Sequence, residues 1–290
     1  MPSAHVNDID IEYLTDGDPA DPPLLLIAGL GLQLTVWAPG FVNCLRQRGF
    51  FVIRFDNRDS GLSSKLEGVP DLAAVLGGDL SSAVYEIDDM ADDAAALLAH
   101  LNIERAHVAG MSLGGMISQA LAIRYPQLVA SACSIMSTTG DPGVGSPTPG
   151  AAGALLEPAG SSREEAVDRA VKIRRVIGSP GYPADEKTLR QEAAANYDRA
   201  NFPEGFARQL AAIFASPERT CDLGKVHAPF LVIHGEDDPL VTLSGGQATA
   251  GAVPGARLLT FPGMGHDLPP QLWEEIGEAI AVNARSAKGF

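Results

Sequence analysis

Gly110-Met111-Ser112-Leu113-Gly114 stands between a short apolar run, residues 106–109, and a helix-period stretch, residues 113–125. A Gly-x-Ser-x-Gly motif at a strand-to-helix turn predicts a nucleophilic serine. The serine takes strained backbone angles there, and side chains two positions away on either side would collide with the turn. Gly110 and Gly114 remove those side chains. We therefore predict Ser112 as the nucleophile, and the Leu113 N–H at the helix start as one donor to a developing oxyanion.

Other short apolar runs in the chain are typical of strands that are buried on both faces. They span residues 24–28, 50–55, 128–136, 230–233 and 256–261. Helix-period stretches separate several of them, and this alternation predicts an α/β fold with a doubly wound, mostly parallel sheet. The first fifteen residues alternate between apolar and polar side chains, which predicts an antiparallel hairpin at the sheet edge.

Residues 137–219 interrupt the alternation, because they contain no convincing strand. A segment rich in Gly, Pro and Ser, residues 140–162, leads into helical stretches that begin near a capping box of the form Ser161-x-x-Glu164. We predict that residues 137–219 form a helical cap, inserted into a core domain that comprises residues 1–136 and 220–290.

A serine nucleophile needs a base, and the base needs an anion that fixes its tautomer. His266 lies in a glycine-rich loop, Gly263-Met264-Gly265-His266, after the last expected strand and before a helix at 271–285. Such a loop emerges at the carboxyl edge of a parallel sheet, where the Ser112 turn also lies. We predict His266 as the general base. Structural positions are expected for the other five histidines: His5, His100, His107, His227 and His234.

The acid is expected at a strand end on the same edge. Gly235-Glu236-Asp237-Asp238-Pro239 follows the strand at 230–234, and its three consecutive acids leave the assignment open from spacing alone. Asp141, shortly after the strand at 128–136, is a further candidate. The chain order Ser, Asp, His is the order that this architecture requires.

A second oxyanion donor is expected in the loop after the strand at 24–28. Ala28-Gly29-Leu30-Gly31 occupies that position, and we predict the Leu30 N–H as the donor.

Composition limits the partners of the chain. Its 36 acidic and 21 basic residues give a formal net charge of −15, which disfavours nucleic acid and anionic membranes. No apolar run is long enough for membrane insertion, and the N-terminus lacks a secretory pattern. The scattered cysteines Cys44, Cys133 and Cys221 favour buried thiols in a reducing compartment over a disulfide framework or a zinc site. We expect a cytoplasmic protein that needs neither a metal nor an organic cofactor.

With these residues placed, the sequence resembles the α/β-hydrolase superfamily over nearly its whole length. Residues 56–63, Asp-Asn-Arg-Asp-Ser-Gly-Leu-Ser, are similar to the family's Asp-x-Arg-Gly-x-Gly-x-Ser segment, with Asp59 at the position of its first glycine. The family's acid lies three residues past a glycine, which points to Asp238. Many members have His-Gly where this chain has Ala28-Gly29. In length and in the Asp-x-Arg-Asp variant the chain is similar to aclacinomycin methylesterases and related actinobacterial carboxylesterases.

The resemblance implies a serine hydrolase, foremost a carboxylesterase that cleaves small to medium esters through an acyl-enzyme intermediate. Lactonases, C–C bond hydrolases and cofactor-free perhydrolases use the same triad and are alternatives. A non-catalytic ligand receptor on the same fold is an alternative of another class. The serine at 112 argues against haloalkane dehalogenases and epoxide hydrolases, which place an aspartate there.

Overall fold

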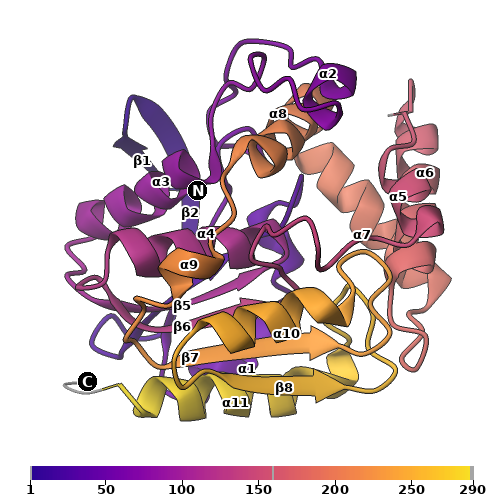
Figure 1. The fold of residues 1–290 in the computed structure, drawn as a ribbon. Helices are drawn as coiled ribbons and strands as arrows, with labels where there is room; N and C mark the ends of the chain where they lie inside the picture. Colours follow the sequence, from indigo (N-terminus) through magenta and orange to yellow (C-terminus); the bar gives the residue numbers. More distant parts are fainter. Residues whose placement is uncertain (1, 159, 288–290) are drawn as a thin grey trace.

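An eight-stranded sheet forms the centre of the molecule in the computed structural model, which describes residues 2–158 and 160–287 (Figure 1). The strand order is β1-β2-β4-β3-β5-β6-β7-β8. The first two strands join the sheet antiparallel, and the other six run parallel to one another. Their bounds are β1 Ser3–Val6, β2 Ile9–Asp16, β3 Pro23–Ile27, β4 Phe51–Phe55, β5 Ala106–Met111, β6 Val129–Ile135, β7 Phe230–Gly235 and β8 Arg257–Phe261.

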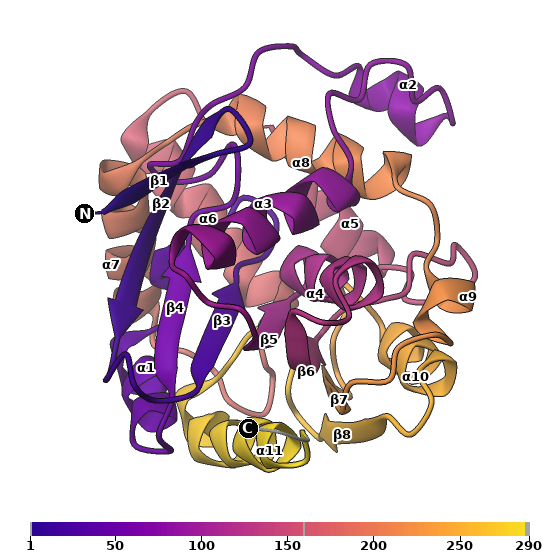
Figure 2. The ribbon, with the colours of Figure 1, turned by 90° about the vertical axis from the view of Figure 1, so that its left-hand side faces the viewer.

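Helices cover both faces of the sheet, as Figure 2 shows along the twisted strands. Strands alternate their side chains between the faces, so Leu25 and Ile27 enter one apolar core while Leu24 and Leu26 enter the other. The first core is covered by α3 (Ile87–His100) and α4 (Leu113–Arg124), and the second by α1 (Pro39–Arg46) and α11 (Trp273–Arg285). The near-continuous apolar runs in the sequence reflect this burial on both sides. The fold class predicted from the sequence is confirmed.

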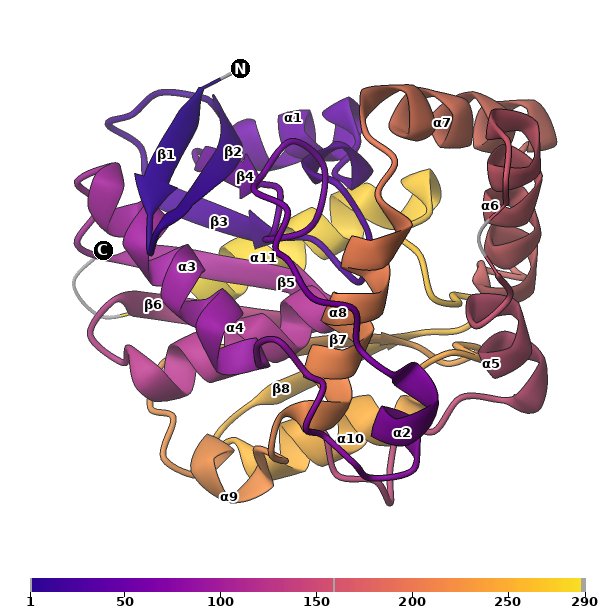
Figure 3. The same ribbon diagram turned by 90° about the horizontal axis from the view of Figure 1, so that it is seen from above.

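Helices fill the chain between β6 and β7. Their bounds are α5 Pro149–Leu155, α6 Arg163–Ile177, α7 Glu186–Arg199, α8 Pro203–Ala215 and α9 Thr220–Leu223. No strand occurs among the described residues of the 137–219 segment, which leaves out only residue 159. Seen from above, α8 crosses over the sheet and lies beside α2 (Leu72–Leu76) (Figure 3). The remaining helix of the core, α10 (Leu243–Ala252), packs on β7.

Two local expectations need correction. The N-cap of α6 is Ser162, whose side chain accepts from the Glu165 N–H, so the cap lies one residue after the predicted Ser161-x-x-Glu164 box. Ser161 instead donates its N–H to the Glu165 carboxylate. All three cysteines are free, but Cys221 is exposed, because it lies on the short helix α9 at the surface. The predicted burial is therefore wrong for that thiol.

The carboxyl ends of the parallel strands meet along one edge of the sheet. The turn after β3, the Ser112 turn after β5, the acidic turn after β7 and the His266 loop after β8 all leave the sheet there. In open α/β sheets this edge is where ligands bind.

Candidate active site

Ser112 occupies a strained turn between β5 and α4. Its φ of 54° and ψ of −120° lie in a region that L-residues rarely adopt. Two hydrogen bonds hold the turn: the Ser112 N–H donates to Ile135 O (2.9 Å), and the Ser137 hydroxyl donates to Ser112 O (2.8 Å). The side chain of Ser112 is half-buried, so the strained turn leaves its hydroxyl partly accessible.

The two glycines of the motif are required by close backbone contacts. A Cβ at Gly110 would lie 1.9 Å from Gly114 O, and a Cβ at Gly114 would lie 2.1 Å from Ile27 O. Each contact is far inside van der Waals distance and involves backbone, which cannot move aside. The collisions predicted from the sequence are thus present at both positions.

Asp238 and His266 are hydrogen-bonded to each other. The His266 Nδ1–H donates to Asp238 Oδ2 at 2.7 Å, which leaves Nε2 as the proton acceptor of the neutral ring. The other oxygen, Oδ1, accepts the N–H groups of Leu240 (2.8 Å) and Val241 (3.0 Å). Both side chains are buried, with 4% and 9% of each residue exposed. The carboxylate is therefore fixed in orientation and shielded from water, as a partner of a histidine base must be.

The other candidate acids are engaged elsewhere. Glu236 accepts from the Thr260 hydroxyl, Asp237 accepts from the Gly263 N–H, and Asp141 accepts from the Gly143 N–H. Among the described residues, none of these three carboxylates bonds His266. The geometry therefore favours Asp238 over the acids that sequence spacing left open.

Ser112 and His266 lie at the same sheet edge, but no hydrogen bond joins them within the described chain. Catalytic hydrogen bonds of this kind are often long in ligand-free enzymes and tighten when substrate binds.

The turn after β3 lies against Ser112. A Cβ at Gly29 would stand 3.3 Å from the Ser112 Cβ. The Leu32 N–H donates to Gly29 O, and the Gly31 N–H donates to the Gln209 side chain. Neither the Leu30 N–H nor the Leu113 N–H donates to another group of the described residues. Oxyanion donors need N–H groups that lack such a partner.

Comparison with known proteins identifies the family. A family model described as alpha/beta hydrolase fold matches residues 22–171. The chain is 32% identical over 311 residues to rhodomycin D methylesterase of Streptomyces sp. (strain C5) and 30% identical over 309 residues to that of Streptomyces peucetius, with 99% of each chain covered. The chain belongs to the α/β-hydrolase fold family. Among solved structures, the enol-lactonase from Burkholderia xenovorans LB400 matches this hydrolase with a TM-score of 0.72 at 25% identity, covering 98% of both chains.

These relatives bear on the predictions made from the sequence. The family and fold are confirmed, and two full-length methylesterase relatives agree with a carboxylic ester hydrolase. The enol-lactonase matches one of the stated alternatives. Within residues 2–158 and 160–287 the hydrolase has no helix of the length and apolar composition needed to cross a membrane. The same residues contain no cluster of three or more His, Cys, Asp or Glu side chains suited to a metal ion.

The loop that carries His266 is held by residues that sequence reasoning missed. The His266 N–H donates to Ile177 O at 2.7 Å, and the Gly265 N–H donates to the Ser179 hydroxyl at 2.9 Å. Ser179 in turn donates to the buried carboxylate of Asp267. The end of α6 thus fixes the loop that carries His266. No motif signals the contact, because the partners lie almost ninety residues apart.

His234 contacts the turn that carries Asp238. It is fully buried on β7, and its Nε2–H donates to Val241 O at 2.7 Å. Burial lowers the pKa of His234, so the ring stays neutral at physiological pH although Asp238 lies 3.7 Å away. The structural position expected for this histidine agrees with its contacts, which brace the turn that orients Asp238.

Proposed function

We propose that the protein hydrolyses carboxylic esters by two-step acyl transfer, with Ser112 as nucleophile, His266 as general base and Asp238 as orienting acid. The observation that carries the proposal is the buried 2.7 Å hydrogen bond between His266 and Asp238 at the sheet edge where Ser112 leaves β5. Family membership and the two methylesterase relatives support the reaction class.

The mechanism follows from the roles of these side chains. His266 Nε2 takes the Ser112 proton as Oγ attacks the ester carbonyl, and Asp238 stabilises the imidazolium that forms. The Leu30 and Leu113 N–H groups donate hydrogen bonds to the oxyanion. Gly110 and Gly114 take no part in the reaction, but their lack of a side chain allows the backbone turn at Ser112. His266 then protonates the leaving alcohol. Water, deprotonated by the same histidine, attacks the acyl-enzyme and releases the acid.

For the substrate we propose a small-molecule methyl ester, whose leaving group is methanol. The support is the name of the two relatives that align over 99% of the chain. Residues 137–219 are proposed to act as a cap that shapes the acyl pocket. Lactone hydrolysis is the second candidate, favoured by the enol-lactonase likeness over the full chain. C–C hydrolysis and perhydrolysis are further alternatives with the same triad. A receptor role is the alternative that an active wild-type protein contradicts.

The net charge of −15 supports a partner that is neither nucleic acid nor an anionic membrane surface. Three free cysteines support a reducing compartment, and we propose the cytoplasm as the place of action.

The test compares matched variants on a short-chain p-nitrophenyl ester and a panel of methyl esters and lactones. Ser112→Ala is expected to abolish the acyl-enzyme mass shift. Asp238→Asn is expected to lower kcat by about 10⁴, because an amide at this position favours the wrong tautomer of His266. Asp237→Asn is the control and is expected to keep kcat within about threefold, because its partner is a backbone N–H at the surface. If the wild-type protein shows neither turnover nor an acyl-enzyme, the proposal that it is a serine hydrolase is wrong. If Asp237→Asn is inactive, the assignment of Asp238 as the orienting acid is wrong.

A further inference from the structure

Helix α8 is fixed on the loop that follows β4 by a buried ion pair. Arg208 donates Nε to Asp59 Oδ2 (2.9 Å) and Nη2 to Asp59 Oδ1 (2.8 Å), and both residues are 2% exposed. A third bond runs from Arg208 Nη1 to Gly68 O. The helix approaches so closely that a Cβ at Gly205 would lie 2.2 Å from Asp59 O. The position of α8 relative to this loop is therefore tightly determined.

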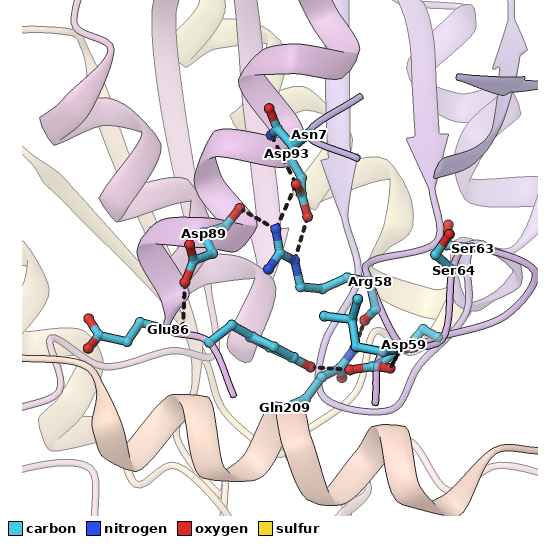
Figure 4. A network of polar contacts seen from close by, with 12 residues as sticks. Asn7, Arg58, Asp59, Ser63, Ser64, Glu86, Asp89, Asp93 and Gln209 are labelled. Carbon is cyan, nitrogen blue, oxygen red and sulfur yellow. Dashed lines mark hydrogen bonds and ion pairs between the residues drawn. The ribbon is translucent and has the colours of Figure 1, made fainter. Parts of the chain in front are cut away.

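The next residue along α8, Gln209, joins this loop to the turn after β3. It is completely buried, and its Nε2 donates to Arg58 O (2.7 Å) and to the Ser60 hydroxyl (3.0 Å). Its Oε1 accepts the Gly31 N–H at 2.8 Å. Figure 4 shows the Gln209 side chain rising from the helix toward Arg58 and Asp59. Each polar atom of Gln209 therefore has a backbone partner, Arg58 O for Nε2 and the Gly31 N–H for Oε1, and the Ser60 hydroxyl is an additional acceptor for Nε2.

The Gly31 N–H belongs to a four-residue turn that also contains Leu30. The Leu32 N–H donates to Gly29 O and closes the turn, and Gly31 at its third position has a φ of +66°, which is typical of a type II turn. The central peptide of this turn joins Leu30 to Gly31. The Gln209 acceptor on the Gly31 N–H fixes the plane of that peptide, and thereby restrains the backbone at Leu30 from its C-terminal side.

We propose that Gln209 is a positioning residue for acyl transfer, which holds the turn at Gly29–Leu32 so that the Leu30 N–H faces the oxyanion. This inference rests on the proposed function. Gln209 does not touch the reacting atoms. It acts through Gly31, and its own place is set by the Asp59–Arg208 pair. Oxyanion donors stabilise the transition state only when they are aimed correctly beforehand, so loss of Gln209 reduces transition-state binding more than ground-state binding.

The experiment compares Gln209→Met, which keeps the side-chain volume and removes both polar groups, with Ser60→Ala. The control removes one neighbour of the same buried amide and leaves the Gly31 bond in place. On a p-nitrophenyl ester, Gln209→Met is expected to lower kcat by about 10 to 100-fold, below the 10² to 10³ of an entirely deleted donor, with KM within about threefold. Affinity for a trifluoromethyl ketone, which mimics the tetrahedral oxyanion, is expected to fall by the same factor as kcat/KM. Ser60→Ala is expected to keep both values near wild type.

Gln209→Glu provides a second readout. Because burial disfavours the charged form, the new carboxyl is expected to be protonated, so it keeps an acceptor oxygen for the Gly31 N–H and an O–H donor for Arg58 O. Recovery of kcat to within about threefold of wild type supports the positioning role, also where Gln209→Met does not fold. A loss in Gln209→Glu as large as in Gln209→Met, or equal losses of kcat in Gln209→Met and Ser60→Ala, overturns it. A wild-type protein that forms no acyl-enzyme contradicts the proposed function itself, whereas an active wild type with an unaffected Gln209→Met contradicts only the positioning role.

Discussion

Replacing Arg208 by methionine leaves the Asp59 carboxylate buried without its cation. The remaining partners of Asp59 are the Tyr85 hydroxyl (2.8 Å) and the Leu66 N–H (2.8 Å). Breaking a buried pair by removing one partner typically costs about 3 to 5 kcal/mol. Because Arg208 and Asp59 are each 2% exposed and bonded in a bidentate manner, we expect Arg208→Met to lie in that range. Urea unfolding of the variant and the wild type measures the loss.

Arg163→Met is the matched control, since Arg163 makes a bidentate pair with Asp198 in which both side chains are more than half exposed. Its loss is expected to stay below about 1 kcal/mol, because water screens exposed pairs.

Asp59→Gly completes the cycle. Asp59 has a φ of +68°, which glycine adopts without strain, so the change removes the carboxylate without straining the backbone. It leaves Arg208, the Tyr85 hydroxyl and the Leu66 N–H without their acceptor, and the double variant separates the Arg208 contribution from the other two. We expect the free energy of unfolding of the double variant to fall by about 2 to 3 kcal/mol less than the sum of the losses in the two single variants. Additivity within about 0.5 kcal/mol, or equal losses for Arg208→Met and Arg163→Met, refutes the reasoning.

Three further outcomes are expected. Gly114→Ala places a methyl group 2.1 Å from Ile27 O and is expected to lower the free energy of unfolding by more than about 4 kcal/mol. Gly153→Ala on α5, where the added methyl group meets open space, is the control and is expected to raise it by up to about 1 kcal/mol in urea unfolding. Burial lowers the pKa of His107 to about 4, so the unfolded chain binds a proton more readily than the folded one below pH 6.5. The free energy of unfolding is therefore expected to fall by up to about 1.4 kcal/mol per pH unit as the pH is lowered from 6.5 to 4. His107→Gln is expected to remove this contribution when unfolding is measured as a function of pH. A thiol reagent is expected to label Cys221 alone in the native protein and all three cysteines in denaturant; a second native label contradicts the burial.

Much of the fold could be predicted because strands that are buried on both faces appear in the sequence as continuous apolar runs. The six parallel strands begin and end within about two residues of those runs. The α6 cap was misplaced by one residue because Ser161 and Ser162 are adjacent and equally suited to capping. Only the backbone angles decide which of the two is the N-cap, and the sequence does not carry them.

The proposed nucleophile turn and the proposed base loop have a strong sequence signal for a different reason. Glycines on either side of a serine, and a histidine in a glycine loop after the last strand, each restrict the local backbone directly. The acid was harder, because three neighbouring carboxylates have similar local chemistry. What distinguishes Asp238 is a turn in which Oδ1 accepts two following N–H groups and Oδ2 reaches His266, 28 residues away.

Support of the oxyanion turn lies beyond any local pattern. The resemblance implies His-Gly in many family members where this chain has Ala28-Gly29, and neither of these two residues has a polar side chain. In the structure, the Asn57 amide donates to Ala28 O at 3.0 Å, and Gln209, 178 residues along the chain from Gly31, holds the other end of the turn. Asp59 lies in the loop after β4, as Asn57 does, at a position where the resemblance implies a glycine. It binds Arg208, the neighbour of Gln209 on α8. The two departures from the family pattern are therefore connected: the ion pair that Asp59 makes possible fixes the helix from which Gln209 reaches the turn. Without that ion pair, α8 and Gln209 are expected to shift, which weakens the bond from the Gly31 N–H to Gln209. We therefore expect Arg208→Met to lower kcat in the same way as Gln209→Met.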